Sequence, residues 1–183
     1  MRSAYGAKEI RIGGHLVTIV VDVANVMGSR PDGWWRDRAG AAVRLHAEVV
    51  RLAASGRAIL PDDPAPPGRA SPSAETSPPG FVMVLEGAAR AAAARIAAAD
   101  RAAAGHPATT ADPAADPAVD PVRPGEVRVV QARGSGDDTI VAVVRELPGR
   151  RVVVTADREL RERCVAAGAT ILGPGWLLGL LRD

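Results

Sequence analysis

Residues 16–22 read LVTIVVD, a run of six mainly apolar residues that ends at Asp22. Valine and isoleucine favour strands because their branched side chains are restricted at χ1. A strand that is apolar at successive positions, rather than at alternate ones, is typical of a parallel sheet covered on both faces. Residues 152–154 (VVV) have the same character near the other end of the chain. We therefore predict a buried parallel sheet with Leu16–Asp22 as a central strand.

Strands and helices alternate along the rest of the sequence. Further strands are expected at Phe81–Glu86, Val127–Gln131, Arg151–Thr155 and Thr170–Leu172. Apolar spacing, with glycine or proline as the stop signal, predicts helices at Arg38–Ser55, Ala88–Ala104, Asp137–Leu147, Arg158–Ala167 and Trp176–Leu181. This alternation predicts an α/β fold with three layers, α/β/α, around a mostly parallel sheet of about five strands.

The length of 183 residues fits one domain that spans residues 1–183. Of the 15 prolines, 12 fall in two stretches in which Ala, Asp, Ser and Gly fill most of the remaining positions. Such composition favours an extended, solvated chain. Residues 61–79 and 105–125 are therefore predicted to be disordered insertions in loops.

Net charge and cysteine content exclude several classes of protein. The formal net charge is only +2, so a site for a polyanion must come from local clusters of arginine. Cys164 is the only cysteine, which excludes an internal disulfide and a multi-cysteine zinc site. The first apolar run is too short for a signal sequence or a membrane span, so we expect a cytoplasmic protein without a membrane partner.

Acidic residues follow the predicted strands. Asp22 ends the first, Glu86 the second, Asp137 and Asp138 follow the third, and Asp157 follows the fourth. Parallel strands bind ligands at their carboxyl edge, where these side chains would meet. Two carboxylates about 4 Å apart repel by roughly 4 kcal/mol at an effective dielectric constant of 20, unless a cation lies between them. Oxygen ligands without histidine or cysteine favour Mg²⁺ or Mn²⁺, and all five are candidate ligands.

Each of these acids also has a simpler explanation. Asp157 could cap the helix that follows it, and Asp137 and Asp138 could stabilise the first turn of theirs. Glu86 could be a solvated strand end. Asp22 is the hardest to explain in this way, because the central strand of a buried sheet rarely ends in a charge.

Candidate substrate-binding residues lie after the first strand. Asn25, the only asparagine, could cap a turn, orient the Asp22 carboxylate or contact the substrate. The loop of residues 28–38 (GSRPDGWWRDR) combines two tryptophans with several arginines. Indole rings can stack on unpaired bases and guanidinium groups can bind phosphates, whereas the alternative is that the rings cover the sheet edge. The candidates in this loop are Arg30, Trp34, Trp35, Arg36 and Arg38.

Together these segments resemble NYN domains of the PIN-like nuclease superfamily, from about Val17 to Leu178 without the proline-rich stretches. The resemblance is carried by Asp22 with Asn25, Glu86 with Gly87, residues 137–140 (DDTI) and residues 155–160 (TADREL). The last two segments also resemble the acidic motifs of flap-endonuclease-type 5′ nucleases. Glu86 stands where the NYN pattern commonly has aspartate.

The resemblance implies roles for individual residues. Asp22, Asp137 and Asp157 would be the catalytic metal ligands, and Asp138 and Glu159 would be secondary ligands. Asn25 would lie at the substrate. The products would carry a 5′-phosphate and a 3′-hydroxyl.

The function predicted from the sequence is a metal-dependent nuclease in which Mg²⁺ or Mn²⁺ activates water to hydrolyse a phosphodiester. The expected substrate is single-stranded or structured RNA. Two alternatives remain open at this point. One is a nucleotide pyrophosphohydrolase or phosphatase that acts on small nucleotides, and the other is a non-catalytic module that binds RNA or a partner protein.

Overall fold

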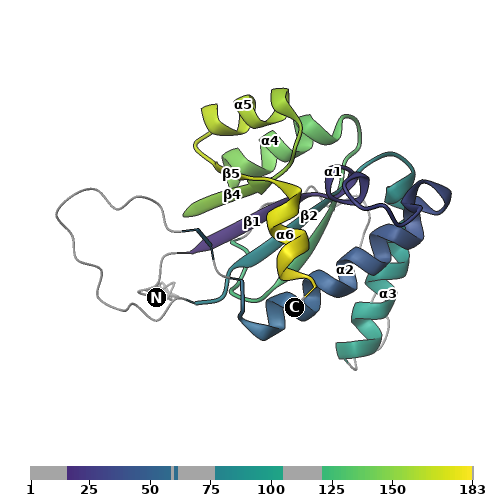
Figure 1. Cartoon of the computed structure of the whole chain (residues 1–183). Coiled ribbons are helices and arrows are strands. Elements are labelled where there is room, and N and C mark those ends of the chain that lie inside the picture. Colours follow the sequence, from purple (N-terminus) through teal and green to yellow (C-terminus); the bar gives the residue numbers. More distant parts are fainter. Residues whose placement is uncertain (1–15, 59, 62–76, 105–120, 183) are drawn as a thin grey trace, which may run out of the picture.

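In the computed structural model, residues 16–58, 60–61, 77–104 and 121–182 are described. Five strands form one sheet in the order β3-β2-β1-β4-β5, and every neighbouring pair is parallel (Figure 1). The strands are β1 (Val17–Asp22), β2 (Gly80–Leu85), β3 (Val127–Gln131), β4 (Arg150–Val154) and β5 (Thr170–Leu172). The predicted parallel sheet with a central first strand is confirmed.

Helices cover both faces of this sheet (Figure 1). One side carries α1 (Val23–Gly28), α2 (Arg38–Ser55), α3 (Ala92–Ala104) and α6 (Pro174–Leu180). The other side carries α4 (Gly136–Glu146) and α5 (Arg158–Ala166). Two 3₁₀ turns, η1 (Trp34–Arg36) and η2 (Gly87–Ala91), precede α2 and α3. The predicted three-layer α/β/α architecture is therefore confirmed.

Side chains of β1 alternate between two apolar cores. Ile19 and Val21 pack in the core that includes Leu45 of α2. Val20 packs in the other core, which includes Ile140 of α4. Both faces of β1 are buried, which explains why its sequence is apolar at successive positions.

The chain adds strands first on one side of β1 and then on the other side. From β1 the chain passes to β2 and then to β3 on one side, through helices that cover one face. It then returns across the sheet through α4 on the opposite face and adds β4 on the other side of β1. Ligands of open parallel sheets bind outside the carboxyl ends of the strands at such a switch point, which here lies between β1 and β4.

Some local structure differs from the prediction. Helix α1, directly after β1, was not predicted because it is only six residues long, although it buries Val23, Val26 and Met27 at helical spacing. The helix predicted over Ala88–Ala104 begins only at Ala92, since Gly87 has a positive φ and a 3₁₀ turn follows it. Most other element ends differ by one or two residues, which is the usual uncertainty of helix and strand ends.

The described ends of the two proline-rich stretches pack against the sheet, while the predicted disordered insertions themselves stay a prediction. Val122 is buried against Gly80, and the Gly125 amide donates to the Pro79 carbonyl at 3.3 Å. Residues 77–79 and 121–125 therefore pack onto the start of β2 and β3, while residues 62–76 and 105–120 lie outside the described part. That residues 1–183 form one domain stays a prediction. No helix in the described ranges has the length and apolarity needed to cross a membrane.

Candidate functional site

The register of the sheet brings the strand-end side chains to one place. Asp22 pairs with Val84 of β2, and Val21 pairs with Val154 of β4, so Thr155 comes next to Asp22. Side chains alternate along a strand, so Asp22 lies on the same face as Val20. By the same alternation Glu86 follows Val84 and Thr155 follows Val153 onto the face that α4 and α5 cover.

A buried threonine connects two of the predicted ligands. Thr155, which has no exposed surface, donates from its hydroxyl to Oδ2 of Asp22 at 2.8 Å. The same hydroxyl accepts a hydrogen bond from the backbone amide of Asp157 at 3.1 Å. Thr155 was not among the predicted site residues. The available signal was a polar residue directly after the apolar run of residues 152–154, where burial demands a hydrogen-bond partner.

Asp22 is the most deeply buried of the acids at this edge, with 6% of its surface exposed. Its other carboxylate oxygen accepts from the backbone amide of Asn25 at 3.1 Å, so it also caps α1. Burial raises the pKa of Asp22, although the hydrogen bonds from Asn25 and Thr155 act in the opposite direction. The negative charge of Glu86 raises this pKa further.

Asn25 holds two loops of the site together. Its side-chain oxygen accepts from the backbone amide of Ala156 at 3.1 Å and so connects α1 to the segment between β4 and α5. This contact explains why an amide side chain stands three residues after Asp22, where a cap or an orienting role was predicted. Contact of Asn25 with a substrate stays a prediction.

Asp137 lies within electrostatic range of acids from other elements. Its pKa is raised first by partial burial and then by the charges of Asp157, Asp22 and Glu159. Arg163 lowers it. The predicted primary ligands therefore share one electrostatic environment at the carboxyl edge, although Asp22 and Asp157 are 135 positions apart in the sequence.

Glu86 acts as a partner for the start of α4. Its Oε2 accepts from the Gly136 amide at 3.0 Å, across 50 positions of sequence. A Cβ atom at Gly136 would collide with this carboxylate, so a larger residue there would force the Glu86 side chain to move. The contact favours a structural role for Glu86, beside the effect of its charge on Asp22.

Asp138 forms an ion pair with Arg163. Its Oδ1 lies 2.5 Å from Nη2 of Arg163, which joins the first turn of α4 to α5. Asp138 raises the pKa of this guanidinium group. A role of Asp138 as a metal ligand would compete with this ion pair.

The acids meet at one edge without forming a ready set of metal ligands. In the described part of the chain, no three His, Cys, Asp or Glu side chains lie close enough together to hold a metal ion. Asp157 instead accepts from the Leu160 amide at 2.8 Å and caps α5. The donors are all hard oxygens, which fit Mg²⁺ or Mn²⁺ by chemistry. Simultaneous binding would require the carboxylates to turn toward one another.

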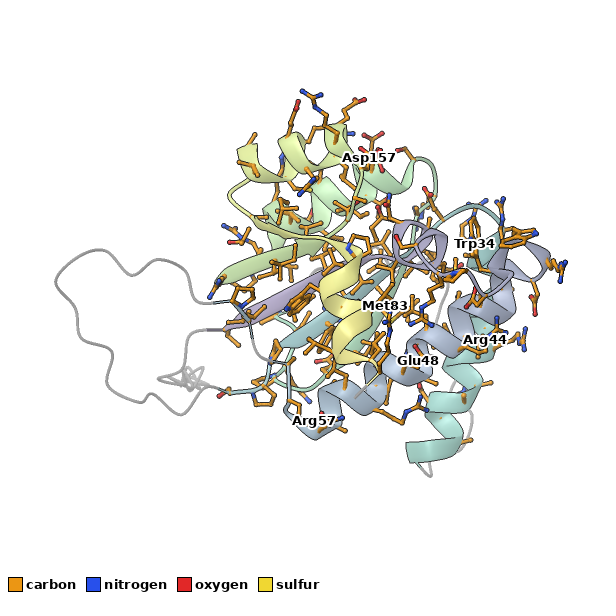
Figure 2. The ribbon with its side chains drawn as sticks, in the orientation of Figure 1. Trp34, Arg44, Glu48, Arg57, Met83 and Asp157 are labelled. Atoms are coloured by element: carbon orange, nitrogen blue, oxygen red, sulfur yellow. The ribbon has the colours of Figure 1, made fainter. Side chains whose placement is uncertain are left out.

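Residues of the predicted substrate loop divide into two groups. Arg30 forms an ion pair with Glu48 of α2 at 2.5 Å, and both side chains are largely shielded from solvent. Trp34 packs partly on the core, as the edge-covering alternative expects. Trp35 is 57% exposed, and Arg36 and Arg38 are exposed beside it. Figure 2 shows Trp34 and Asp157 toward the same end of the sheet.

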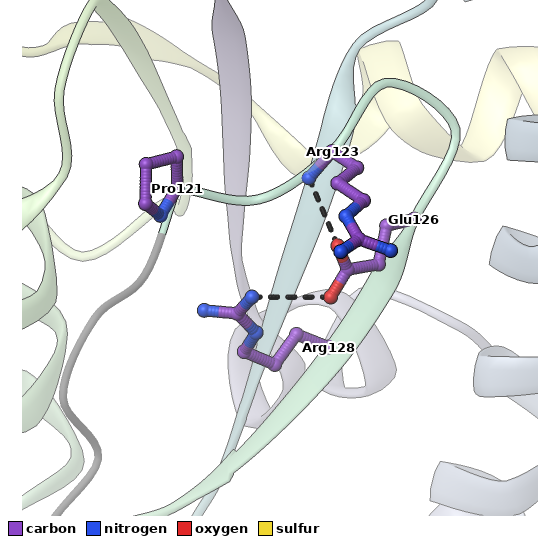
Figure 3. Close-up of a pocket in the computed structure, with 4 residues that line it drawn as sticks. All are labelled: Pro121, Arg123, Glu126 and Arg128. Carbon is purple, nitrogen blue, oxygen red and sulfur yellow. Dashed lines mark hydrogen bonds and ion pairs between the residues drawn. The ribbon is translucent and has the colours of Figure 1, made fainter. Parts of the chain in front are cut away.

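A separate polar pocket lies at the start of β3 (Figure 3). Its lining residues are Pro121, Arg123, Glu126 and Arg128. Glu126 accepts from the Arg123 amide at 2.9 Å and from the Arg128 guanidinium group at 3.1 Å. The pocket lies where β3 begins, and the acids lie where the strands end, so it contains none of the predicted site residues.

Comparisons with known proteins leave the family open. No protein-family model matches the chain, and no curated protein matches it. Among solved structures, a variant of Rae1 (YacP) from Bacillus subtilis is similar with a TM-score of 0.48 and 13% sequence identity. The similarity covers 91% of this chain and 76% of that chain. At this level it does not assign the chain to a family, and membership of the NYN domains stays a prediction.

Proposed function

We propose that this chain is a metal-dependent phosphodiesterase that cleaves nucleic acid, with RNA as its substrate. Asp22, Asp137 and Asp157 would hold Mg²⁺ or Mn²⁺ at the switch point of the sheet. The observation that carries the proposal is the buried Thr155 hydroxyl, which joins the Asp22 carboxylate to the backbone of Asp157 at the carboxyl edge, within electrostatic range of Asp137. Acids from three separate segments are thus held against their mutual repulsion, which a divalent cation would relieve.

The protein's own groups would prepare the site. Thr155 and the Asn25 amide fix the Asp22 carboxylate in its buried position. Arg163 lowers the pKa of Asp137 and so favours the ionised form that metal binding needs. A bound metal would supply a water of lowered pKa and would stabilise negative charge on a phosphoryl oxygen.

A second candidate function is a non-catalytic module that binds RNA or a partner protein. It is favoured by the hydrogen bonds that already occupy the acids. Asp157 caps α5, Glu86 binds the start of α4, and Asp138 pairs with Arg163. Such contacts are sufficient to explain these three acids without a metal.

Measuring turnover of RNA and of nucleoside triphosphates distinguishes the candidate functions. The protein is incubated with labelled single-stranded RNA and, separately, with nucleoside triphosphates, in Mn²⁺ or in EDTA, beside an Asp22→Asn variant. Cleavage of RNA that needs Mn²⁺ and is lost in Asp22→Asn supports the proposed function. Turnover of triphosphates alone would replace it with a nucleotide hydrolase, and RNA binding without turnover would favour the second candidate.

A matched control uses an exposed acid at the far end of α4. Glu146→Gln removes one negative charge away from the carboxyl edge of the sheet. It should retain full cleavage activity. If Glu146→Gln and Asp22→Asn lose activity equally, the loss follows from net charge and the proposed site is wrong.

A further inference from the structure

Four side chains before and at the start of α2, three of them exposed and Trp34 half-buried, form a surface that combines aromatic rings and positive charge. This surface, the Trp35 platform, consists of Trp34, Trp35, Arg36 and Arg38. The indole ring of Trp35 is 57% exposed. An exposed indole offers a flat aromatic face to a ligand.

The rings and cations of the platform hold one another in place. The two indole rings meet edge to face, with centroids 6.3 Å apart and planes at 87°. The guanidinium carbon of Arg38 lies 5.3 Å from the centre of the Trp34 ring, and that of Arg36 lies 5.9 Å from the centre of the Trp35 ring. Trp34 is anchored on the core, so it supports the exposed Trp35.

The backbone beneath the platform is also fixed. Gly33 adopts a φ of 75°, and the Trp34 amide donates to Oδ1 of Asp32 at 3.1 Å. Asp37 caps α2 by accepting from the Gly40 amide at 2.7 Å. Because the turn is held at both ends, a ligand would lose little free energy to ordering it.

The platform stands away from the proposed cleavage site, on the same side of the molecule. Helix α1 starts next to Asp22 and rises about 9 Å over its six residues. The end of α1 faces the ring of Trp34, since a Cβ atom on Gly28 would lie 3.8 Å from that ring. Trp34 therefore lies at the opposite end of α1 from Asp22, so the platform and the acids can contact different nucleotides of one strand.

We propose that Trp35 is a remote subsite that stacks on an unpaired base of a single-stranded nucleic acid whose phosphates contact Arg36 and Arg38. The proposal rests on the proposed function, because the same strand would continue to the acids at the sheet edge. Asp32 and Asp37 add negative charge nearby, but each carboxylate is engaged by a backbone amide. Stacking next to cations is the combination that sequence-tolerant single-strand sites use.

A protein partner is a weaker explanation for this surface. Specific protein interfaces bury about 800 Å² on each partner around an apolar centre. Here only Trp35 offers an exposed indole, because Trp34 is already packed on the core. Charged side chains surround this single ring. The platform is suited in size to one base rather than to a protein surface.

Binding is tested in EDTA, so that no cleavage occurs, by fluorescence anisotropy with a short labelled single-stranded oligoribonucleotide. Trp35→Ala should weaken binding about ten-fold, whereas Trp35→Phe, which retains a stacking ring, should stay close to wild type. Arg36→Gln should lower the salt dependence of binding by about 0.7 in the slope of log K against log salt. The matched control, Arg145→Gln at the far end of α4, should change neither value beyond the effect of net charge.

An oligonucleotide of the same length without bases separates stacking from phosphate contacts. Wild type should bind it as weakly as Trp35→Ala binds the normal strand, and Trp35→Ala should lose no further affinity. Equal binding of both strands by wild type would overturn the proposal. So would a Trp35→Ala variant that folds by circular dichroism and binds like wild type, in which case Trp35 serves another partner.

Failure of this inference is distinguishable from failure of the proposed function. With Mn²⁺, Trp35→Ala should lower kcat/KM more for a long strand than for a substrate too short to reach the platform. If neither protein cleaves any substrate, the proposed function is wrong, while the binding results still decide the role of Trp35. If Trp35→Ala cleaves the long strand with wild-type kcat/KM, the subsite is wrong and the function stands.

Discussion

At the scale of single residues, Thr155 is the side chain on which two of the acids depend. Replacing it with valine removes the donor to the buried Asp22 carboxylate and the acceptor for the Asp157 amide. We expect Thr155→Val to lower the free energy of unfolding by about 1–3 kcal/mol, because it leaves buried polar groups unpaired. Urea unfolding measures this change.

Thr155→Ser is the matched control for this prediction. Serine retains the hydroxyl group and loses only a methyl group, so it should recover most of the lost stability. If Thr155→Val is as stable as wild type, the hydrogen bonds from Thr155 do not hold Asp22 and the loop before α5 in place.

Some features of the candidate site could be predicted from the sequence and others could not. Asp22 was chosen as a candidate because a charge at the end of a buried strand is unusual, and the apolar run before it is visible in the sequence. Arg30 was expected to bind phosphate, yet it pairs with Glu48, 18 positions away. Such a contact depends on how α2 packs, which spacing along the sequence does not encode.

At the scale of elements, the start of α4 lies directly against Glu86 at Gly136. A side chain at Gly136 would collide with the carboxylate of Glu86. We expect Gly136→Ala to lower the free energy of unfolding by about 1–3 kcal/mol, as overpacking usually does. Gly134→Ala is the matched control, since no atom lies within 4 Å of the Cβ it would add.

A double variant tests the cause of that loss. Glu86→Ala combined with Gly136→Ala removes the colliding carboxylate. The double variant should therefore lose less free energy of unfolding than the two single variants lose in total. Strict additivity in the unfolding experiments would show that Gly136→Ala acts through the backbone of α4 and not through Glu86.

The contact between α2 and α3 is expected to make stability depend on pH. His46 on α2 is buried, and its Nε2 lies 3.7 Å from Oδ2 of Asp100 on α3. Burial lowers the pKa of His46 below its usual 6.5, while the charge of Asp100 opposes that shift. The unfolded chain therefore takes up a proton first as the pH falls, and stability is lost below about pH 6.5.

Two substitutions check this expectation by urea unfolding at pH 7.5 and pH 5.5 (about one unit on either side of the ordinary histidine pKa). His46→Gln should reduce the loss of stability between the two values. Asp100→Asn removes the opposing charge, so it should make the loss larger than in wild type. An unchanged difference in both variants would mean that other groups govern the pH dependence.

At the scale of the whole molecule, the sheet was predictable and the ligand geometry was not. Apolar runs and helical spacing are local properties, so the order of strands and helices could be read from them. The convergence of Asp22, Asp137 and Asp157 followed from the rule for carboxyl edges of parallel sheets. The orientation of each carboxylate depends on long-range partners such as Thr155 and Gly136, which only the folded chain brings into contact.

Metal binding at the acidic edge should stabilise the entire fold. A cation that binds the folded chain but not the unfolded one adds about 2.7 kcal/mol at a concentration 100 times its dissociation constant. For a chain of this size we expect Mn²⁺ to raise the melting temperature by roughly 5–10 °C, and EDTA to reverse the rise. Asp137→Asn should melt at the same temperature with and without Mn²⁺, whereas Glu146→Gln should respond like wild type. Equal rises in wild type and Asp137→Asn would place the cation elsewhere, and no rise in wild type would leave the acids as helix caps and ion-pair partners.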